Sequence, residues 1–149
     1  MKRTFLVALS LLVATSLFAS DPAQEAREAE IAFAKAFTDR DVEKFFGMVA
    51  EDAHFLGPKN AFAGRERVRE GWAGFFKDKE APFNWKPERV FANAAGTLAL
   101  STGPIYGSDG QHVGNFSSVW QKDKDGSWKV IFDGPGSALP CPPPAAKKE

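Results

Sequence analysis

The sequence predicts an α+β domain in which helices from the first half of the chain pack against a sheet formed by the second half. Apolar residues recur at helical spacing as far as residue 76, and after Pro82 the apolar pattern alternates as in strands. Glycine-containing turns join the later strands directly, and direct hairpin connections build an antiparallel sheet rather than a parallel one.

The first twenty residues are predicted to be a secretory signal peptide. Lys2 and Arg3 precede an apolar run that ends at Phe18, and the small residues Ala19 and Ser20 lie just before Asp21. The uncharged run is shorter than the ~20 residues that a membrane-spanning helix needs. We therefore expect an exported protein, periplasmic or secreted, with no membrane span in the mature chain.

Three domain segments follow from this pattern: a signal peptide at 1–20, a folded domain at 21–134 and a disordered, proline-rich tail at 135–149. The folded segment is long enough to bury one hydrophobic core. The single cysteine, Cys141, lies in the tail, so we expect neither an intrachain disulfide nor a cysteine-based zinc site.

Three helices are expected, beginning after Asp21, Asp41 and Gly64. The two aspartates are good N-cap residues, and Pro22 suits the first helical position. The three apolar faces would be formed by Ala26, Ala29, Phe33, Ala36 and Phe37, then by Val42, Phe45, Phe46 and Val49, and finally by Val68, Trp72, Phe75 and Phe76.

Strands are expected where apolar residues alternate between turns. Pro87 lies inside one of these segments, and because proline lacks an N–H it indicates an edge strand or a bulge. The Asp-Gly turns at 109–110 and 125–126 are typical of hairpins. The expected strands are 52–56, 83–91, 97–107, 112–122 and 127–133.

The charge composition argues against a nucleic-acid partner. The chain has 19 Lys+Arg and 19 Asp+Glu residues, and nucleic-acid binding needs a concentrated basic face. The sequence also lacks the common signatures for a bound metal, a nucleotide or an activated serine. We therefore expect no metal site and no cofactor, which leaves acid–base chemistry or simple binding.

Five short segments occur in the order and spacing of one protein family: 50–55, 64–66, 102–104, 119–120 and 125–130, the last of which reads Asp-Gly-Ser-Trp-Lys-Val. Between Gln24 and Gly134 the chain resembles the NTF2-like superfamily, which includes ketosteroid isomerase and the SnoaL-like cyclases. Its local sequence is most similar to the DUF4440 group. The resemblance implies a cone, made by a curved antiparallel sheet that the three helices close, with a mostly apolar pocket. It also implies a homodimer formed through the sheet.

The isomerase activity is not carried over by this resemblance. When ketosteroid isomerase is aligned without a gap, its oxyanion-donor tyrosine falls on Phe33 and its catalytic aspartate on Gly57. Phe33 has no hydroxyl to stabilise an enolate, and Gly57 has no side chain to move a proton.

If the protein is an enzyme, His54 and Asp133 are the candidate catalytic pair, with His54 as the base and Asp133 as the group that orients it. Alternation along the strand places His54 opposite Phe55, which favours an outward position instead. Asp133 would share a face with Ile131 and Lys129.

A ligand-binding pocket is the other prediction. Aromatic residues from separate elements converge in this fold, and each could serve core packing instead of a ligand. Two polar residues on one strand face could supply specific contacts. We expect the pocket to bind a small hydrophobic or amphipathic molecule, with a cofactor-free isomerase, dehydratase or cyclase as the alternative. The candidate ligand-binding residues are Phe33, Phe55, Trp72, Trp85, Tyr106, Asn115, Ser117 and Trp120.

Overall fold

The computed structural model describes residues 21–57 and 59–136. The predicted signal peptide, Cys141 and nearly all of the predicted tail lie outside these residues. The elements, in chain order, are α1 (Pro22–Thr38), α2 (Val42–Gly47), β1 (Val49–Leu56), β2 (Ala61–Ala63), α3 (Arg65–Trp72), the 3₁₀ turn η1 (Ala73–Phe76), β3 (Phe83–Trp85), β4 (Arg89–Ala92), β5 (Leu98–Gly107), β6 (His112–Lys122) and β7 (Trp128–Pro135).

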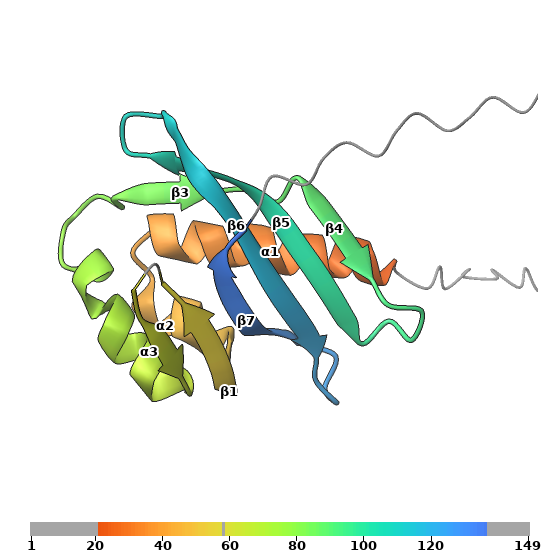
Figure 1. Cartoon of the computed structure of the whole chain (residues 1–149). Helices are drawn as coiled ribbons and strands as arrows, with labels where there is room; N and C mark the ends of the chain where they lie inside the picture. Colours follow the sequence, from red (N-terminus) through yellow and green to blue (C-terminus); the bar gives the residue numbers. More distant parts are fainter. Residues whose placement is uncertain (1–20, 58, 137–149) are drawn as a thin grey trace, which may run out of the picture.

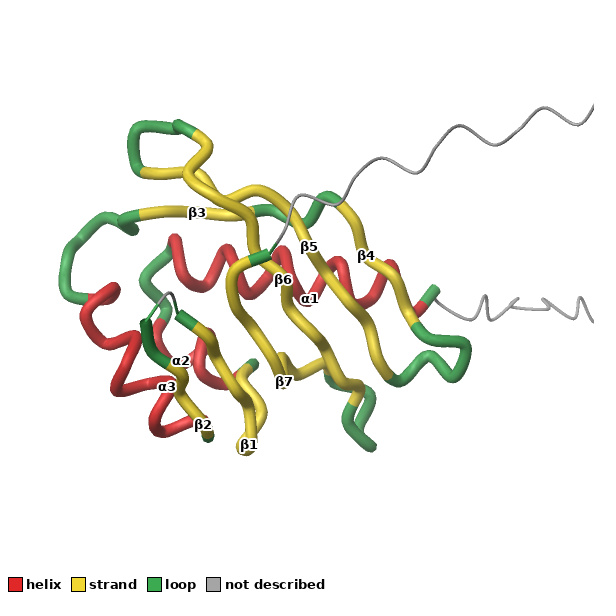
Figure 2. The backbone as a smooth tube through the Cα atoms, viewed as in Figure 1, coloured by secondary structure: helices red, strands yellow, loops and turns green. Residues whose placement is uncertain are grey.

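The predicted α+β class is confirmed. The sheet has the order β2-β1-β7-β6-β5-β3, and β4 pairs with β5 beyond the end of β3. All pairings are antiparallel except that of β1 with β7. The sheet is curved and open, and the three helices lie on one of its sides (Figures 1 and 2). We call the side toward α1 the inner face and the other side the outer face.

The strand predicted at 83–91 is two strands, β3 and β4. The segment Lys86–Glu88 between them, which we call the 86–88 linker, crosses close to Gly103 of β5. A Cβ atom at Gly103 would lie 2.1 Å from the carbonyl oxygen of Lys86. Pro87 also cannot donate a ladder hydrogen bond, so the pairing breaks here. The short strand β2 was not predicted from the sequence.

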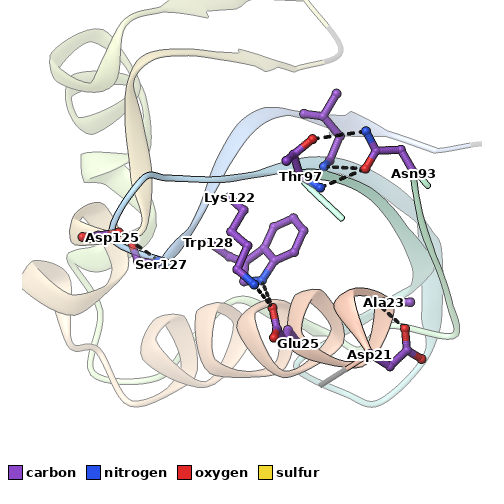
Figure 3. A network of polar contacts seen from close by, with 10 residues as sticks. Asp21, Ala23, Glu25, Asn93, Thr97, Lys122, Asp125, Ser127 and Trp128 are labelled. Carbon is purple, nitrogen blue, oxygen red and sulfur yellow. Dashed lines mark hydrogen bonds and ion pairs between the residues drawn. The ribbon is translucent and has the colours of Figure 1, made fainter. Parts of the chain in front are cut away.

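Helix α1 is fixed to the sheet near its start. Asp21 caps the helix by accepting a 3.0 Å hydrogen bond from the N–H of Ala23. One turn later, the Glu25 carboxylate accepts from Trp128 Nε1 at 3.0 Å and pairs with Lys122 Nζ (Figure 3). Trp128 and Lys122 belong to the β6–β7 hairpin, so these contacts join the first helix to the last strands.

The Asp-Gly-Ser-Trp-Lys-Val segment has a structural role. Gly126 has a positive φ of 87°, which glycine adopts without strain. The carboxylate of Asp125 accepts hydrogen bonds from the backbone and the hydroxyl of Ser127 (Figure 3). Trp128 binds Glu25, as described above, and the N–H of Val130 donates to Met48 at 2.9 Å. These residues fold the hairpin and attach it to α1 and to Met48, the residue between α2 and β1.

Aromatic rings fill the space between the helices and the inner face. Phe33 is fully buried, stacks on Phe45 with ring centroids 4.1 Å apart, and meets Trp120 edge-on at 5.6 Å. Phe37 contacts a second group of rings that includes Trp72, with centroids 5.9 Å apart. Packed rings of this kind contribute burial energy together with favourable edge-to-face contacts.

Candidate functional site

A carboxyl group lies inside this aromatic core. Glu30 of α1 has 0% exposure, and its two oxygens accept hydrogen bonds from the indole N–H groups of Trp85 and Trp120, each at 2.7 Å. Burial raises the pKa of Glu30, while the two indoles and the hydroxyls of Ser101 and Ser118 oppose that rise. Two N–H donors are the arrangement that best supports the ionised form of a buried carboxyl.

Asp133 of β7 faces the same region. Its carboxyl accepts a 2.8 Å hydrogen bond from Ser118 Oγ, and Ser118 lies directly opposite it on β6. Burial, together with the nearby charge of Glu30, raises the pKa of Asp133 to about 8. Near neutral pH, Asp133 therefore holds a proton that an ordinary aspartate has lost.

We call Glu30 and Asp133 the carboxyl pair, because the nearby charge of Glu30 contributes to the raised pKa of Asp133. Glu30 is the better carboxylate, because each of its oxygens already accepts from an indole, whereas Asp133 has a single hydroxyl partner. The Ser101 hydroxyl lies close enough to lower the pKa of Glu30, yet it makes no full hydrogen bond with any described residue. With a pKa of about 8, Asp133 can donate or accept a proton near neutral pH.

The inward position of Asp133 depends on a β-bulge. Val119 pairs with Phe132 and Trp120 with Val130, so Ile131 is left without a partner on β6. The extra residue reverses the alternation. Asp133 consequently lies on the face of Val130, and the expected common face with Ile131 and Lys129 was wrong.

His54 does not meet Asp133. Its ring is exposed on the outer face, where it stacks on Phe132 with centroids 5.5 Å apart, and its Nδ1 lies 3.0 Å from the carbonyl oxygen of Asp52. Phe55, the next residue, is buried on the inner face, where it pairs with Asp133 of the neighbouring strand β7. The structure thus places His54 and Asp133 on opposite sides of the sheet, and the predicted base–acid pairing is not formed.

Most of the predicted aromatic ligand contacts are packing contacts. Phe33, Phe55 and Trp120 are fully buried, and Trp85 is nearly so, with its N–H committed to Glu30. Trp72 is half-buried against the same cluster. None of the four surface grooves described by the structure is lined by Phe33, Phe55, Trp72 or Trp120.

Asn115 and Ser117 share a strand face, as predicted, but that face is the outer one. Phe116 and Ser118, which alternate with them, are buried on the inner side. The two polar side chains therefore point away from the cone interior and cannot supply polar contacts to a ligand there.

Asn115 instead lines a groove of about 510 Å³ on the outer face, which is called the groove below. This groove lies between the 86–88 linker and the β5–β6 hairpin. Its position depends on the close approach of the linker to Gly103. Its lining residues are Lys86, Pro87, Glu88, Pro104, Tyr106, His112 and Asn115.

The polar groups of the groove are organised around Tyr106. Lys86 Nζ lies 5.5 Å from the centre of the tyrosine ring, within cation–π range. The His112 ring meets Tyr106 edge-on with centroids 6.1 Å apart. A 3.2 Å hydrogen bond joins His112 Nε2 to Asn115 Oδ1. Tyr106 and Asn115 are thus two predicted ligand contacts that the structure brings to one surface site.

A second outer feature crosses five strands. Phe91, Leu100, Val119, Phe132 and His54 occupy successive paired positions on β4, β5, β6, β7 and β1. Phe91 is 54% exposed, Leu100 39% and Phe132 50%. We call these five residues the outer row. A contiguous exposed apolar patch of this kind is typical of an interaction surface.

Glu30 was missed by the sequence analysis, although the sequence carries a signal for it. It occupies an apolar-stripe position of α1, four residues after Ala26 and three before Phe33. A charged residue inside such a stripe indicates a buried polar group that needs partners. The role of Lys86 and Glu88 had no such signal, because their position depends on how the linker crosses β5.

Residues 31–131 match the SnoaL-like domain family, and the chain belongs to it. The fold is that of the NTF2-like superfamily. An NTF2-like protein of unknown function from Pseudomonas putida KT2440 is 19% identical, with a TM-score of 0.62 over 80% of this chain and 88% of that chain. A ketosteroid isomerase-like protein from Erwinia carotovora atroseptica is 16% identical, with a TM-score of 0.60 over 76% and 94%.

An NTF2-like protein of unknown function from Shewanella oneidensis MR-1 is 14% identical, with a TM-score of 0.63 over 76% of this chain and 98% of that chain. These similarities establish the fold. A search of curated proteins found no match. Within the described residues, no helix is both long and apolar enough to cross a bilayer.

Proposed function

We propose that this SnoaL-like domain is a small-molecule-binding protein and that its ligand occupies the groove beside Tyr106. Small-molecule sites combine an apolar surface with a few placed polar groups. In the groove, Pro87, Pro104 and Tyr106 provide the apolar surface, and Lys86 and Asn115 provide polar groups.

The observation that carries this proposal is that the interior aromatic residues are packed against one another, whereas Tyr106 lines an open groove. The interior rings are packed against one another, and the indoles of Trp85 and Trp120 are bonded to Glu30. Tyr106, by contrast, lines an open groove beside polar side chains. A ligand could therefore contact Tyr106 without disturbing the core, whereas an interior ligand would have to displace packed rings.

The proposal can be tested with a single spectroscopic probe, because Tyr106 is the only tyrosine in the chain. Protein labelled with 3-fluorotyrosine should give one ¹⁹F resonance. We expect this resonance to differ between protein purified from its native host and the same protein after unfolding, dialysis and refolding. Mass spectrometry under native conditions should detect the lost ligand. Identical resonances and no bound mass would count against groove binding.

Acid–base catalysis is a second candidate, and the carboxyl pair is the observation that favours it. Asp133 would act as the proton donor, with Glu30 holding the negative charge. The test is solvent deuterium exchange at carbon atoms next to the carbonyl group in a panel of ketones. Asp133→Asn should abolish the exchange, while Asp78→Asn, at an exposed position in the loop before β3, should not. Exchange that survives in Asp133→Asn would exclude this role for Asp133.

The outer row supports a further part of the proposal, a homodimer formed through the sheet. Five paired positions about 4.8 Å apart extend over roughly 19 Å, and a symmetric interface would cover the row with its own copy. Phe132→Glu should give a folded monomer in sedimentation velocity, whereas the exposed substitution Lys79→Glu should leave a dimer. A wild-type monomer at micromolar concentration would contradict this part.

We further propose that the protein is exported and that residues 1–20 are removed. The support is the order of charged, apolar and small residues at the start of the chain. N-terminal sequencing of protein from the native host should begin at Ser20 or Asp21. A sequence that begins at Met1 in a membrane fraction would overturn the proposal of export.

A further inference from the structure

We infer that the groove is built for a small zwitterion that carries a flat apolar part, as an aromatic amino acid does. This inference rests on the proposed binding function and adds the chemical class of the ligand. It comes from three features of the groove: two opposite charges that line it, an apolar surface beside them, and a backbone segment that is held in place.

The opposite charges belong to Lys86 and Glu88. They are separated by Pro87 in the 86–88 linker, and both side chains line the groove. Because both side chains line one groove of about 510 Å³, a single small ligand can reach both charges. Neither side chain forms an ion pair with any residue of the described ranges. The ammonium and the carboxylate are therefore both available to a ligand.

This charge arrangement selects against ligands with one charge. A simple anion attracted by Lys86 would be repelled by Glu88, and a simple cation attracted by Glu88 would be repelled by Lys86. A zwitterion satisfies both side chains at once, with its carboxylate toward Lys86 and its amine toward Glu88. Because the two charges cancel, the groove favours a ligand of zero net charge.

The apolar part of the ligand would lie on Tyr106. Pro87 and Pro104 line the same groove and present rigid apolar surfaces of their own. The Lys86 ammonium is already 5.5 Å from the ring centre, so a carboxylate bound to it would place the rest of the ligand beside the tyrosine. Ring stacking and burial would then favour an aromatic side chain over a short polar one.

The backbone that carries the two charges is held by four contacts. The N–H of Glu88 donates to the carbonyl of Thr102 at 2.9 Å, and Arg27 of α1 donates to the carbonyls of Pro87 at 3.1 Å and Glu88 at 3.4 Å. The close approach at Gly103 fixes the height of the linker above β5. A site on a fixed backbone binds with a smaller entropic cost than one on a mobile loop.

The test compares three compounds that share a phenyl ring: L-phenylalanine, 3-phenylpropionate and 2-phenylethylamine. Each is titrated into full-length protein labelled with 3-fluorotyrosine, and the Tyr106 resonance is followed. L-phenylalanine should bind roughly two- to fivefold more tightly than either analogue, the effect of one exposed charge pair. Lys86→Gln should reduce the affinity for L-phenylalanine to that of 2-phenylethylamine. Glu88→Gln should reduce it to that of 3-phenylpropionate. The exposed substitution Lys79→Gln should have no effect.

The outcomes separate this inference from the proposed function. Equal affinity for the three compounds, or tighter binding of a single-charge analogue, would overturn the zwitterion assignment while leaving groove binding in place. The same conclusion would follow if the Tyr106 resonance responded to the natural ligand but to none of the three compounds. If neither the compounds nor the natural ligand alter the resonance, both the inference and the proposed function are wrong. The His112 signal gives a second readout in the groove, and the His54 signal is the control on the outer row.

Discussion

Replacing Asp133 with asparagine should change how the stability of the protein depends on pH. The folded pKa of about 8 lies above the ordinary value of 3.8, so the folded state holds this proton more tightly than the unfolded state. The favourable contribution is complete below the unfolded pKa and is lost as the pH rises through the folded one. The wild-type protein should therefore lose stability through this residue between pH 5 and pH 8.

The size of the effect follows from the two pKa values. At 1.36 kcal/mol for each pKa unit, the loss between pH 5 and pH 8 would be at most about 4 kcal/mol. Asp133 is partly exposed, and water that reaches it should reduce the loss to about 2 kcal/mol. Asparagine cannot ionise and can keep the contact with Ser118. The unfolding free energy of Asp133→Asn should therefore fall less between pH 5 and pH 8 than that of the wild-type protein.

The assay is urea denaturation, followed by tryptophan fluorescence at several pH values, with Asp78→Asn as the control for loss of an exposed carboxylate. The quantity compared is the change in unfolding free energy between pH 5 and pH 8. If Asp133→Asn retains the same pH dependence as wild type, the inward position and raised pKa of Asp133 are refuted.

Two further substitutions test the core and the linker. Trp120→Phe removes the N–H that donates to Glu30 at 2.7 Å and leaves a buried oxygen unpaired, so unfolding free energy should fall by about 2–4 kcal/mol; a loss well under 1 kcal/mol in denaturant would contradict the contact. Gly103→Ala places a Cβ 2.1 Å from the Lys86 carbonyl oxygen and should cost about 1–3 kcal/mol while moving the Tyr106 resonance. Gly114→Ala, which meets no atom within 4 Å, is its control, and equal effects of the two alanines would refute the close approach.

The fold could be predicted from local patterns because helical spacing and hairpin turns are encoded in neighbouring residues. The caps at Asp21 and Asp41 and the hairpin partners at 98–107 and 112–122 agree with the structure. The interruption at the 86–88 linker could be predicted only in part. Pro87 indicated an irregularity, but the approach to Gly103 depends on a strand that lies fifteen or more residues later in the chain.

The site could not be predicted in the same way, because it depends on tertiary register. One unpaired residue, Ile131, turns Asp133 inward, and strict alternation assigned it the wrong companions. Glu30 could have been recognised as a charge inside an apolar stripe, but its two indole partners are 55 and 90 residues away. For His54 and Phe55, simple alternation in β1 was sufficient, since both side chains lie where that pattern placed them.

The central claim is that a ligand binds the outer groove and leaves the packed interior unchanged. The most direct measurement records, in one titration with L-phenylalanine, the fluorine resonance of Tyr106 and the indole N–H resonances of Trp85 and Trp120. We predict that the Tyr106 resonance shifts and saturates, while both indole resonances stay in place because their bonds to Glu30 persist. Indole resonances that shift while Tyr106 does not would place the ligand in the interior and contradict the account.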